Sequence, residues 1–446
     1  MSDDRLGFWG AVSIGLGGMI GGGVFSVLGV VATVAGTASW LAFTTASLVS
    51  LCAAYSYIAL NEIGDRHGGS VTQIQSFTGR GQAAGMVGWT LLFGYVGAIA
   101  MYAYAFGGFA LELVPAGAGS GIGVPLRPLL SIVAVALFVA LNIAGARATG
   151  ASEMALVAAK VTILLGVSAW GLWYGAQGGQ LEFGLAQFDG MGLLTATAIS
   201  FVSFQGWQLL MYDYDSVQNA AENIPRAIYV SIAGAIVVDS MVAILVTSLV
   251  ETSVIQQHPE IAVARAVEPF LGNLGFVFIA VAALFSTGSA INGTLFSAAH
   301  FGKGLLSEGL APDRLGDGDA DGVPERTVIV LGGIAAVFTA YGPLEAITSF
   351  ESLAFMAVFG TMSWLAFTQR DHDAVNPVVP AVGVIGVVAF APLLLSRLYT
   401  EQQAVFWSVF ALSGAVIAVE LLYFEREVIA DDVEAFEEDV AGALFD

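Results

Sequence analysis

The sequence predicts an all-α polytopic membrane protein, and two observations lead to that prediction. The chain of 446 residues is 57% hydrophobic and only 11% charged, whereas soluble domains carry about 25% charged residues. Apolar stretches long enough to cross a bilayer as helices recur from Gly7 to Phe424 with few interruptions. A soluble globular domain is therefore excluded.

Twelve of these stretches are expected to be transmembrane helices. Along the chain their ranges are 8–32, 38–62, 83–113, 125–145, 151–175, 191–217, 226–250, 271–302, 326–342, 345–369, 377–397 and 402–424. No cleavable signal peptide is expected, because the first stretch is too long for the apolar core of one. Two of the polar connections, 64–82 and 303–325, are long.

The positions of Arg and Lys predict the orientation, because cytoplasmic loops carry an excess of basic residues. With the N-terminus inside, three arginines fall outside: Arg127, Arg265 and Arg397. The cytoplasmic parts then hold Arg5, Arg66, Arg80, Arg147, Arg226, Lys303, Arg314, Arg326, Arg370 and Arg426. We therefore expect a multi-pass protein of the cell membrane with both termini in the cytoplasm.

The composition is acidic, with a formal net charge of −22 and only two lysines, Lys160 and Lys303. Acidic, lysine-poor surfaces stay hydrated in concentrated salt, so we expect a halophilic archaeal source. The segment 425–446 holds nine acidic residues and one arginine and is expected to be a solvated cytoplasmic tail. Nothing in the sequence suggests nucleic-acid binding.

Enzyme and metal chemistry find no support in the sequence. The single cysteine, Cys52, excludes an internal disulfide, and the four histidines are scattered among loops and segment ends. We therefore expect no metal, no cofactor and no catalytic residue. A channel is not favoured either, because no ring of charged residues or filter sequence is visible.

Glycine and polar residues interrupt the first and sixth segments at matching places, around residues 15–23 and 200–208. Interrupted helices in corresponding positions of two halves are typical of transporters built from inverted repeats, where the unwound backbone binds the solute. The alternative is close helix packing through small residues, which is common in membranes. Because both segments are interrupted, the binding-site interpretation is favoured.

Lys160 is the most informative single residue. It lies about ten residues into the fifth apolar segment, near mid-bilayer at ~1.5 Å of rise per residue. A lysine at that depth costs several kcal/mol without partners, so its presence predicts a function. The alternative, a lysine whose ammonium snorkels to the interface, fits this central position less well.

Five stretches resemble the amino acid–polyamine–organocation (APC) transporters. Residues 17–25, Gly-Gly-Met-Ile-Gly-Gly-Gly-Val-Phe, are similar to the first-helix motif of that superfamily, G-x-x-I-G-x-G-I/V-F. Similarities follow in order to its fifth helix at 141–160, its sixth helix at 203–207 and 223–228, its eighth helix at 269–276 and 283–286, and the next loop at 307–312. The similarity is strongest to archaeal, proton-coupled members of broad specificity.

The resemblance implies a LeuT-type fold with two inverted repeats of five helices, 8–175 and 191–369, and with helices 1 and 6 broken. Two peripheral helices at 377–424 would follow. It also implies that the ammonium of Lys160 replaces a coupling sodium ion. Lys160 would then contact the Gly17 carbonyl and hydroxyls of the eighth segment, Ser286 and Ser289.

An amino acid is a zwitterion, so its site needs donors for the carboxylate and acceptors for the ammonium. Half-helix ends supply both through free N–H groups and carbonyls. The expected N–H donors are Ile20, Gly21, Gly22 and Gly23, and the expected carbonyl acceptors are Phe201, Val202 and Phe204. The rings of Phe204 and Trp207 either gate the ligand or pack in the bundle core, and Tyr95 is expected to line the pocket.

Several functional alternatives stay open at this point. Protonation of Lys160 would tie three segments together, which favours proton-coupled symport of amino acids with a lean towards small neutral ones. A proton-independent exchanger or facilitator of amino acids or polyamines, and a non-transporting amino acid sensor, share the same sequence features. Asp239, in the seventh segment, is a second titratable site, a remote partner of Lys160, or a residue that is simply hydrogen-bonded or protonated within the bundle, and the last interpretation is favoured. Glu351 either attracts cationic solutes or is a solvated charge near the outer rim, and the solvated charge is favoured.

Overall fold

The chain folds into a bundle of helices. The computed structural model describes residues 5–115, 125–145, 150–184, 190–212, 214–307, 309–310 and 323–424. Within these ranges β-pairing is limited to one isolated bridge between Leu6 and Val217. Helices are expected here because a lipid-embedded backbone must satisfy its polar groups internally.

The helices, in chain order, are α1 (Phe8–Gly22), α2 (Leu28–Ala35), α3 (Ser39–Ile63), α4 (Ser70–Thr78), α5 (Gly81–Leu113), α6 (Leu126–Ile143), α7 (Gly150–Gln177), α8 (Gly190–Ser200), α9 (Leu209–Tyr212), α10 (Ala220–Leu249), α11 (Thr252–Gln257), α12 (Ala262–Arg265), α13 (Glu268–Ser307), α14 (Glu325–Tyr341), α15 (Leu344–Thr368), α16 (Val378–Glu401) and α17 (Gln403–Phe424). A π-helical turn, Gly23–Val27, joins α1 to α2, and a 3₁₀ turn, Phe201–Phe204, follows α8.

Helices lie over all twelve predicted segments, within a few residues at most boundaries. Among the described residues, nine helical stretches are long and apolar enough to cross a membrane, and the first, Phe8–Ile63, contains two predicted segments. The all-α polytopic membrane class is thus confirmed. The acidic tail predicted at 425–446 lies outside the described residues.

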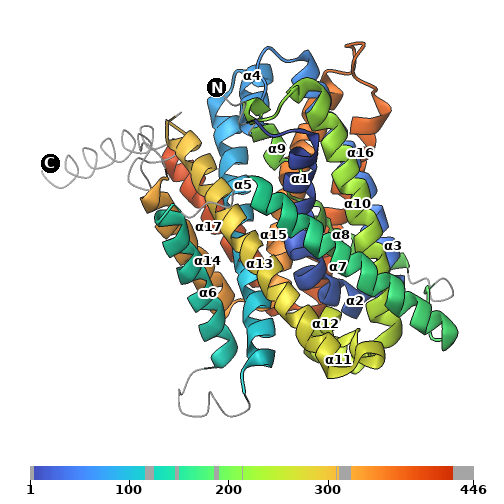
Figure 1. The fold of residues 1–446 in the computed structure, drawn as a ribbon. Coiled ribbons are helices and arrows are strands. Elements are labelled where there is room, and N and C mark those ends of the chain that lie inside the picture. The colour runs from blue at the N-terminus through green and yellow to red at the C-terminus, as the bar shows by residue number, and fades with distance from the viewer. Residues whose placement is uncertain are drawn as a thin grey trace, which may run out of the picture.

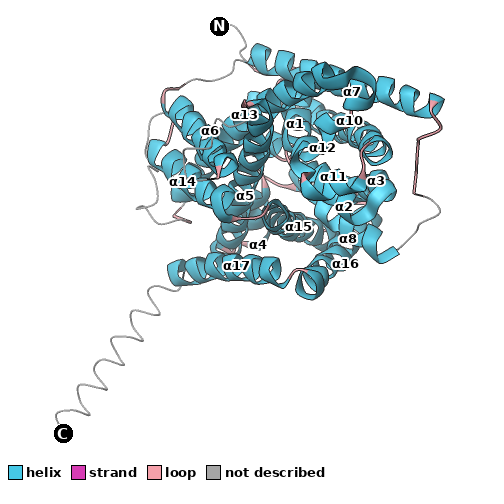
Figure 2. Cartoon of the chain, turned by 90° about the horizontal axis from the view of Figure 1, so that it is seen from below, coloured by secondary structure: helices cyan, strands magenta, loops and turns pink. Residues whose placement is uncertain are grey.

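The bundle has an interior layer of helices and a periphery. Buried residues run along most of α5 and α15, whereas α6 and α16 are buried on one narrow face only. Figure 2 shows α1, α5 and α15 inside a ring that includes α6, α7, α14, α16 and α17. The outer helices expose large apolar side chains, as expected for a surface in contact with lipid.

The two ends of the bundle differ in their connections. In Figure 1, α4 and α9 lie at the top and α11 and α12 at the bottom, and we call these the α4 end and the α11 end. At the α4 end the segment before α1 pairs with the segment after α9. Leu6 N–H donates to Ser216 O (2.8 Å), and Gln218 N–H donates to Leu6 O (2.9 Å).

The first segment differs from its expected form. We expected an unwound stretch near residues 15–23, but the backbone stays helical and instead widens into the π turn. Such single π turns inside α-helices are frequent at functional sites. The sixth segment is interrupted as expected, because the 3₁₀ turn is followed by extended Gln205 (φ −86°, ψ 151°) and by Gly206 at φ 125°.

Gly206→Ala is expected to destabilise the protein. The added methyl group would lie 2.9 Å from backbone atoms of Gly18, and alanine would be forced into a φ that favours glycine. Backbone strain and overpacking each cost about 1–3 kcal/mol. The measurement is the thermal unfolding midpoint of the purified protein in detergent.

Gly333→Ala, on α14, is the control for this comparison, because its added methyl group meets no atom within 4 Å. Alanine there is expected to keep or slightly raise the midpoint, since it favours the helix. If both variants unfolded at the same temperature, the close backbone contact between Gly18 and Gly206 would be contradicted.

Candidate functional site

The candidate site lies where the two interrupted segments cross. The π turn of the first segment packs against the 3₁₀ turn of the sixth. A side chain at Gly23 would meet the Ser203 side chain, 2.8 Å from its Cβ, and one at Gly22 would overlap the Tyr102 ring. Glycine is therefore required at these two positions by close packing in this conformation.

Two hydroxyl groups at this crossing have no hydrogen-bond partner among the described residues. They belong to Ser26 of the π turn and Ser203 of the 3₁₀ turn, and both side chains are buried. Buried polar groups normally form hydrogen bonds. Each of these hydroxyls is therefore expected to bond to a ligand or a water molecule. These two serines were not among the predicted site residues, although both lie inside or next to the glycine and polar motifs of the two segments.

The predicted backbone donors are partly used within the helix. Ile20, Gly21 and Gly22 lie in the last turn of α1, and the Gly23 N–H donates to Met19 O. The Gly23 N–H is thus not free for a ligand in this conformation, which corrects the expectation of an open half-helix end. The physical reason is the π turn, which continues the backbone hydrogen bonding that an unwound stretch would release.

The carbonyls of the sixth segment are also engaged. Val202 O accepts from the Gln205 N–H (3.2 Å), and Phe204 O accepts from Ser50 Oγ (3.2 Å). Beyond them, the Gly206 N–H donates to Gln208 Oε1 (2.6 Å). The side chain of Gln208 therefore stabilises the interruption from within the same segment.

The aromatic side chains of the sixth segment face the bundle core. Trp207 Nε1 donates to Ser50 Oγ (3.0 Å), and its ring lies 5.0 Å from the Phe359 ring and 5.2 Å from the Tyr57 ring, centroid to centroid. The Phe204 ring lies 6.5 Å from the Phe43 ring. In this conformation both rings pack against α3 rather than covering an open pocket. The Phe201 ring also packs against Phe359, at 5.8 Å.

Lys160 joins α7 to α1 beside the crossing. Its side chain is only 8% exposed, and Nζ donates to Gly17 O at 3.2 Å. One turn further along α1, Ser286 Oγ of α13 donates to Gly21 O at 3.4 Å. A Cβ atom added at Gly21 would lie 3.6 Å from Lys160 Nζ, so the ammonium lies next to the glycine run. Ser289 is half-buried on α13.

A cavity of about 570 Å³, which we call the vestibule, lies between the crossing and the α4 end. Its volume is in the usual range for small-molecule sites. Tyr95 of α5 lines it and accepts a hydrogen bond from Gln208 Nε2 (3.4 Å), so the vestibule reaches the interrupted sixth segment. The other lining residues are Val71, Thr72, Leu209, Tyr212, Ser216, Phe296, Ser297, His300, Phe301, Gly304 and Leu305.

The α11 end is closed over the crossing by tight packing and ion pairs. The backbone at Gly29 lies so close to Pro259 O that a side chain there would overlap it, and the Phe25 and Phe109 rings meet edge to face at 5.9 Å. The Arg265 guanidinium bonds to Glu112 (2.7 Å) and to Glu268 (2.9 Å), which joins α12 to α5 and α13. The pair with Glu112 was not predictable from local sequence patterns, because 153 residues separate the partners.

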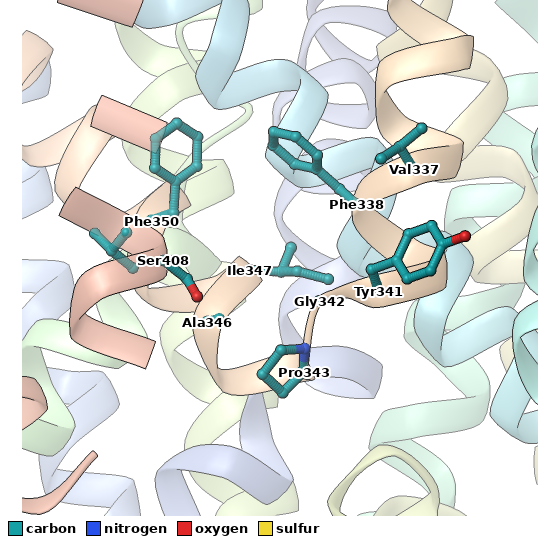
Figure 3. A pocket seen from close by; sticks show the side chains of 10 residues that line it. Val337, Phe338, Tyr341, Gly342, Pro343, Ala346, Ile347, Phe350 and Ser408 are labelled. Atoms are coloured by element: carbon teal, nitrogen blue, oxygen red, sulfur yellow. The ribbon is translucent and has the colours of Figure 1, made fainter. Parts of the chain in front are cut away.

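A second cavity, of about 260 Å³, lies at the periphery between α14, α15 and α17. Figure 3 shows the side chains of Phe338, Ile347 and Phe350 projecting into the space between the helices. Its other side chains are apolar except for Tyr341 and Ser408. An apolar recess on the lipid-facing side of the bundle is suited to an acyl chain and not to a zwitterion.

Two carboxylates inside the bundle have no hydrogen-bond partner among the described residues. Asp239 on α10 is 1% exposed and Glu351 on α15 is 0% exposed, with both oxygens of each unpaired. The interpretation of Glu351 as a solvated rim charge is therefore wrong. The residue lies seven positions inside α15 on a face covered by α5, and the sequence position alone did not reveal this packing.

Comparisons with known proteins identify the family. Residues 6–424 match the amino acid permease family. An uncharacterised protein of Methanocaldococcus jannaschii is 28% identical over 431 residues, covering 95% of this chain and 96% of the relative. The inner membrane transport protein YbaT of Escherichia coli is 26% identical over 427 residues, covering 95% of this chain and 97% of the relative.

The name of a more distant relative states a substrate class, cationic amino acids. Cationic amino acid transporter 4 of Mus musculus is 24% identical over 400 residues, covering 84% of this chain and 61% of the mouse protein. Amino acid transport is the activity that the family and these relatives support. Because the family match extends over nearly the whole chain, the protein belongs to the amino acid permease family of the APC superfamily.

Proposed function

We propose that this protein carries amino acids across the cell membrane together with protons, by alternating access, with both termini in the cytoplasm. The two repeats, 8–175 and 191–369, would rearrange around the crossing of the first and sixth segments. The observation that supports coupling to protons is the hydrogen bond from Lys160 Nζ to Gly17 O, beside the glycine run.

The Lys160 contact links protonation to helix packing. A protonated ammonium is stabilised by carbonyl oxygens, whereas burial away from water favours the neutral amine. The two effects oppose each other, so a small movement of α1 relative to α7 changes which form is favoured. Loss of the proton removes the charge from the bond to Gly17, which weakens the link between α7 and α1. A cation at this place also repels a sodium ion.

The two ends of the bundle fit one state of an alternating-access cycle. The vestibule extends from Tyr95 towards the α4 end, while Arg265 and the Gly29 contact close the α11 end. With the α4 end in the cytoplasm, this conformation faces inward. Opening the other end then requires separation of Arg265 from Glu112 and of the first segment from residues around Pro259.

The proposed substrates are small neutral amino acids. The described residues that line the vestibule have hydroxyl, aromatic and aliphatic side chains and one imidazole, that of His300. None of these described lining residues carries a carboxylate that could bind a second cationic group. The unpaired hydroxyls of Ser26 and Ser203 offer donors to a carboxylate. Val202 O and Phe204 O each accept one hydrogen bond already and keep a second lone pair for an ammonium.

Lys160→Ala is expected to abolish the coupling of amino acid transport to protons and to leave the substrate site intact. In proteoliposomes at high salt, accumulation of labelled alanine or leucine driven by an inward proton gradient should fall at least tenfold. Exchange of labelled for unlabelled substrate without a gradient should persist, because Lys160 is not among the groups proposed to bind the amino acid. Both rates are measured on the same reconstituted sample.

Lys303→Ala, which removes the other lysine of the chain, is the control and should accumulate substrate like the wild type. Accumulation that ignores the gradient in the wild type would indicate an exchanger or facilitator instead. Binding of amino acids without any flux would indicate a sensor.

Arg265→Ala is expected to loosen the α11 end. The Arg265 side chain is 30% exposed, and an ion pair of this kind contributes about 0.2–1 kcal/mol. A loss of about 1 kcal/mol corresponds to a factor of about five in an equilibrium, because about 1.4 kcal/mol corresponds to a factor of ten. The amide hydrogen exchange of residues 259–268 should therefore accelerate by up to about fivefold for each ion pair that is lost. Arg397→Ala is the control, because its partner Glu401 lies on the same helix. Equal exchange in both variants would argue against closure by Arg265.

A further inference from the structure

Glu351 is a buried acid that the proposed role of Lys160 does not use. It lies inside α15 with 0% exposure, and neither carboxylate oxygen has a hydrogen-bond partner among the described residues. Burial of an ionised carboxylate without a partner costs far more than burial of the neutral acid. In the enclosed environment seen here, the carboxyl group therefore needs a bound cation, of which a proton is the smallest.

The neighbours of Glu351 connect it to both interrupted segments. A Cβ atom added at Gly97 of α5 would lie 3.3 Å from Glu351 Cβ, so the acid faces the middle of α5. Tyr102 lies on the same helix, five residues beyond Gly97, and its hydroxyl is within electrostatic range of the carboxylate without a hydrogen bond to it. The next residue on α15, Ser352, donates through Oγ to Ile199 O (2.9 Å), near the end of α8.

Tyr102 carries this connection into the candidate site. Its hydroxyl accepts a hydrogen bond from Gln205 Nε2 at 2.6 Å, and its ring occupies the space that a side chain at Gly22 would fill. The phenol oxygen is thus an acceptor for the sixth segment, and its O–H proton is left to donate elsewhere. A change of charge at Glu351 would therefore reach Gly22 and Gln205 through the electrostatic effect on Tyr102.

The titratable groups around Glu351 do not neutralise it. The phenols of Tyr95 (α5) and Tyr57 (α3) contact Phe355 and Phe359 of α15, four and eight residues beyond Glu351. On α16, which also packs against α15, Arg397 is paired with Glu401. On α15 itself Glu345 lies nearly two turns away and accepts from Gln402 Nε2 (2.6 Å). No ion pair to Glu351 is present among the described residues.

We propose that Glu351 is a proton-binding site that is loaded in the conformation described here and releases its proton when the α11 end opens to water. The proposal rests on the proposed amino acid transport and adds a carrier of protons besides Lys160. When the carboxylate is ionised, it accepts the O–H of Tyr102, which draws Tyr102 away from Gly22 and loosens its bond with Gln205. Protonation state and packing of the crossing are coupled in this way.

A proton fits this site better than a larger cation does. The Glu351 side chain is 0% exposed, so no space for a substrate ammonium adjoins it in this conformation. A metal cation would need several oxygen ligands, and no group of three or more His, Cys, Asp or Glu side chains that could hold a metal is present among the described residues. A proton needs neither a cavity nor further ligands.

The test compares Glu351→Gln with Glu345→Gln in proteoliposomes at high salt. Glutamine imitates the neutral acid, so exchange of labelled for unlabelled alanine without a gradient should persist in Glu351→Gln. Accumulation driven by an inward proton gradient should fall at least tenfold, and the dependence of uptake on external pH should flatten. Glu345→Gln removes a carboxylate from the same helix and should behave as the wild type in both assays.

An infrared spectrum of the reconstituted protein near neutral pH supplies a readout that does not need transport. The carbonyl band of a protonated carboxylic acid should be present in the wild type and weaker in Glu351→Gln. Asp239→Asn identifies the contribution of the other buried acid to the same band. Loss of that band in Asp239→Asn but not in Glu351→Gln would overturn the assignment.

The remaining outcomes separate this proposal from the proposed function. Full gradient-driven accumulation with unchanged pH dependence in Glu351→Gln would overturn the proton site and leave amino acid transport intact. Loss of exchange as well as accumulation in a folded Glu351→Gln protein would overturn it in favour of a structural or substrate-binding role. Absence of both exchange and accumulation in the wild type would instead refute transport itself.

Discussion

The arrangement depends on one constraint, which is that a polar group enclosed in a membrane-embedded bundle must find its partner inside the protein. Lys160 meets this requirement through the carbonyl of Gly17, which a glycine-lined stretch of α1 leaves accessible to a side chain from α7. The same stretch approaches Gly206 and Ser203 of the sixth segment. The bond of Lys160 and the contacts with Gly206 and Ser203 involve the same short stretch of backbone. A movement of that stretch therefore alters both the bond and the contacts.

The groups that lack partners are as informative as those that have them. Ser26 and Ser203 leave unpaired hydroxyls at the crossing, and Glu351 leaves an unpaired carboxyl group beside Tyr102. Other buried side chains of the described residues also have an unpaired polar atom, among them Tyr57, Asp239 and Ser349. Ser26 and Ser203 differ in lying at the crossing itself, where a ligand would complete their hydrogen bonding. They lie between an end closed by Arg265 and a vestibule that leads to the opposite end. That asymmetry is what a carrier needs in order to expose one site to one side at a time.

Much of the fold was predictable because it depends on local properties of the sequence. Lengths of apolar sequence predicted the positions of the helices to within a few residues, since a bilayer sets the length that a helix must span. The interruption at Gln205 and Gly206 followed from their residue types. The π turn at Gly23–Val27 did not, because glycines permit several backbone conformations and packing against Tyr102 and Ser203 selects among them.

The sequence by itself determined the membrane class, the family and the unusual lysine, because composition, motif order and one charge in an apolar segment are visible without coordinates. Only the tertiary structure decided how the aromatic rings of Phe204 and Trp207 pack, which partners Arg265 joins, and that Glu351 is enclosed. Apart from the local pair of Arg265 with Glu268, these features depend on contacts between residues more than a hundred positions apart. Their energies come from the surroundings that folding creates, and no local pattern encodes those surroundings.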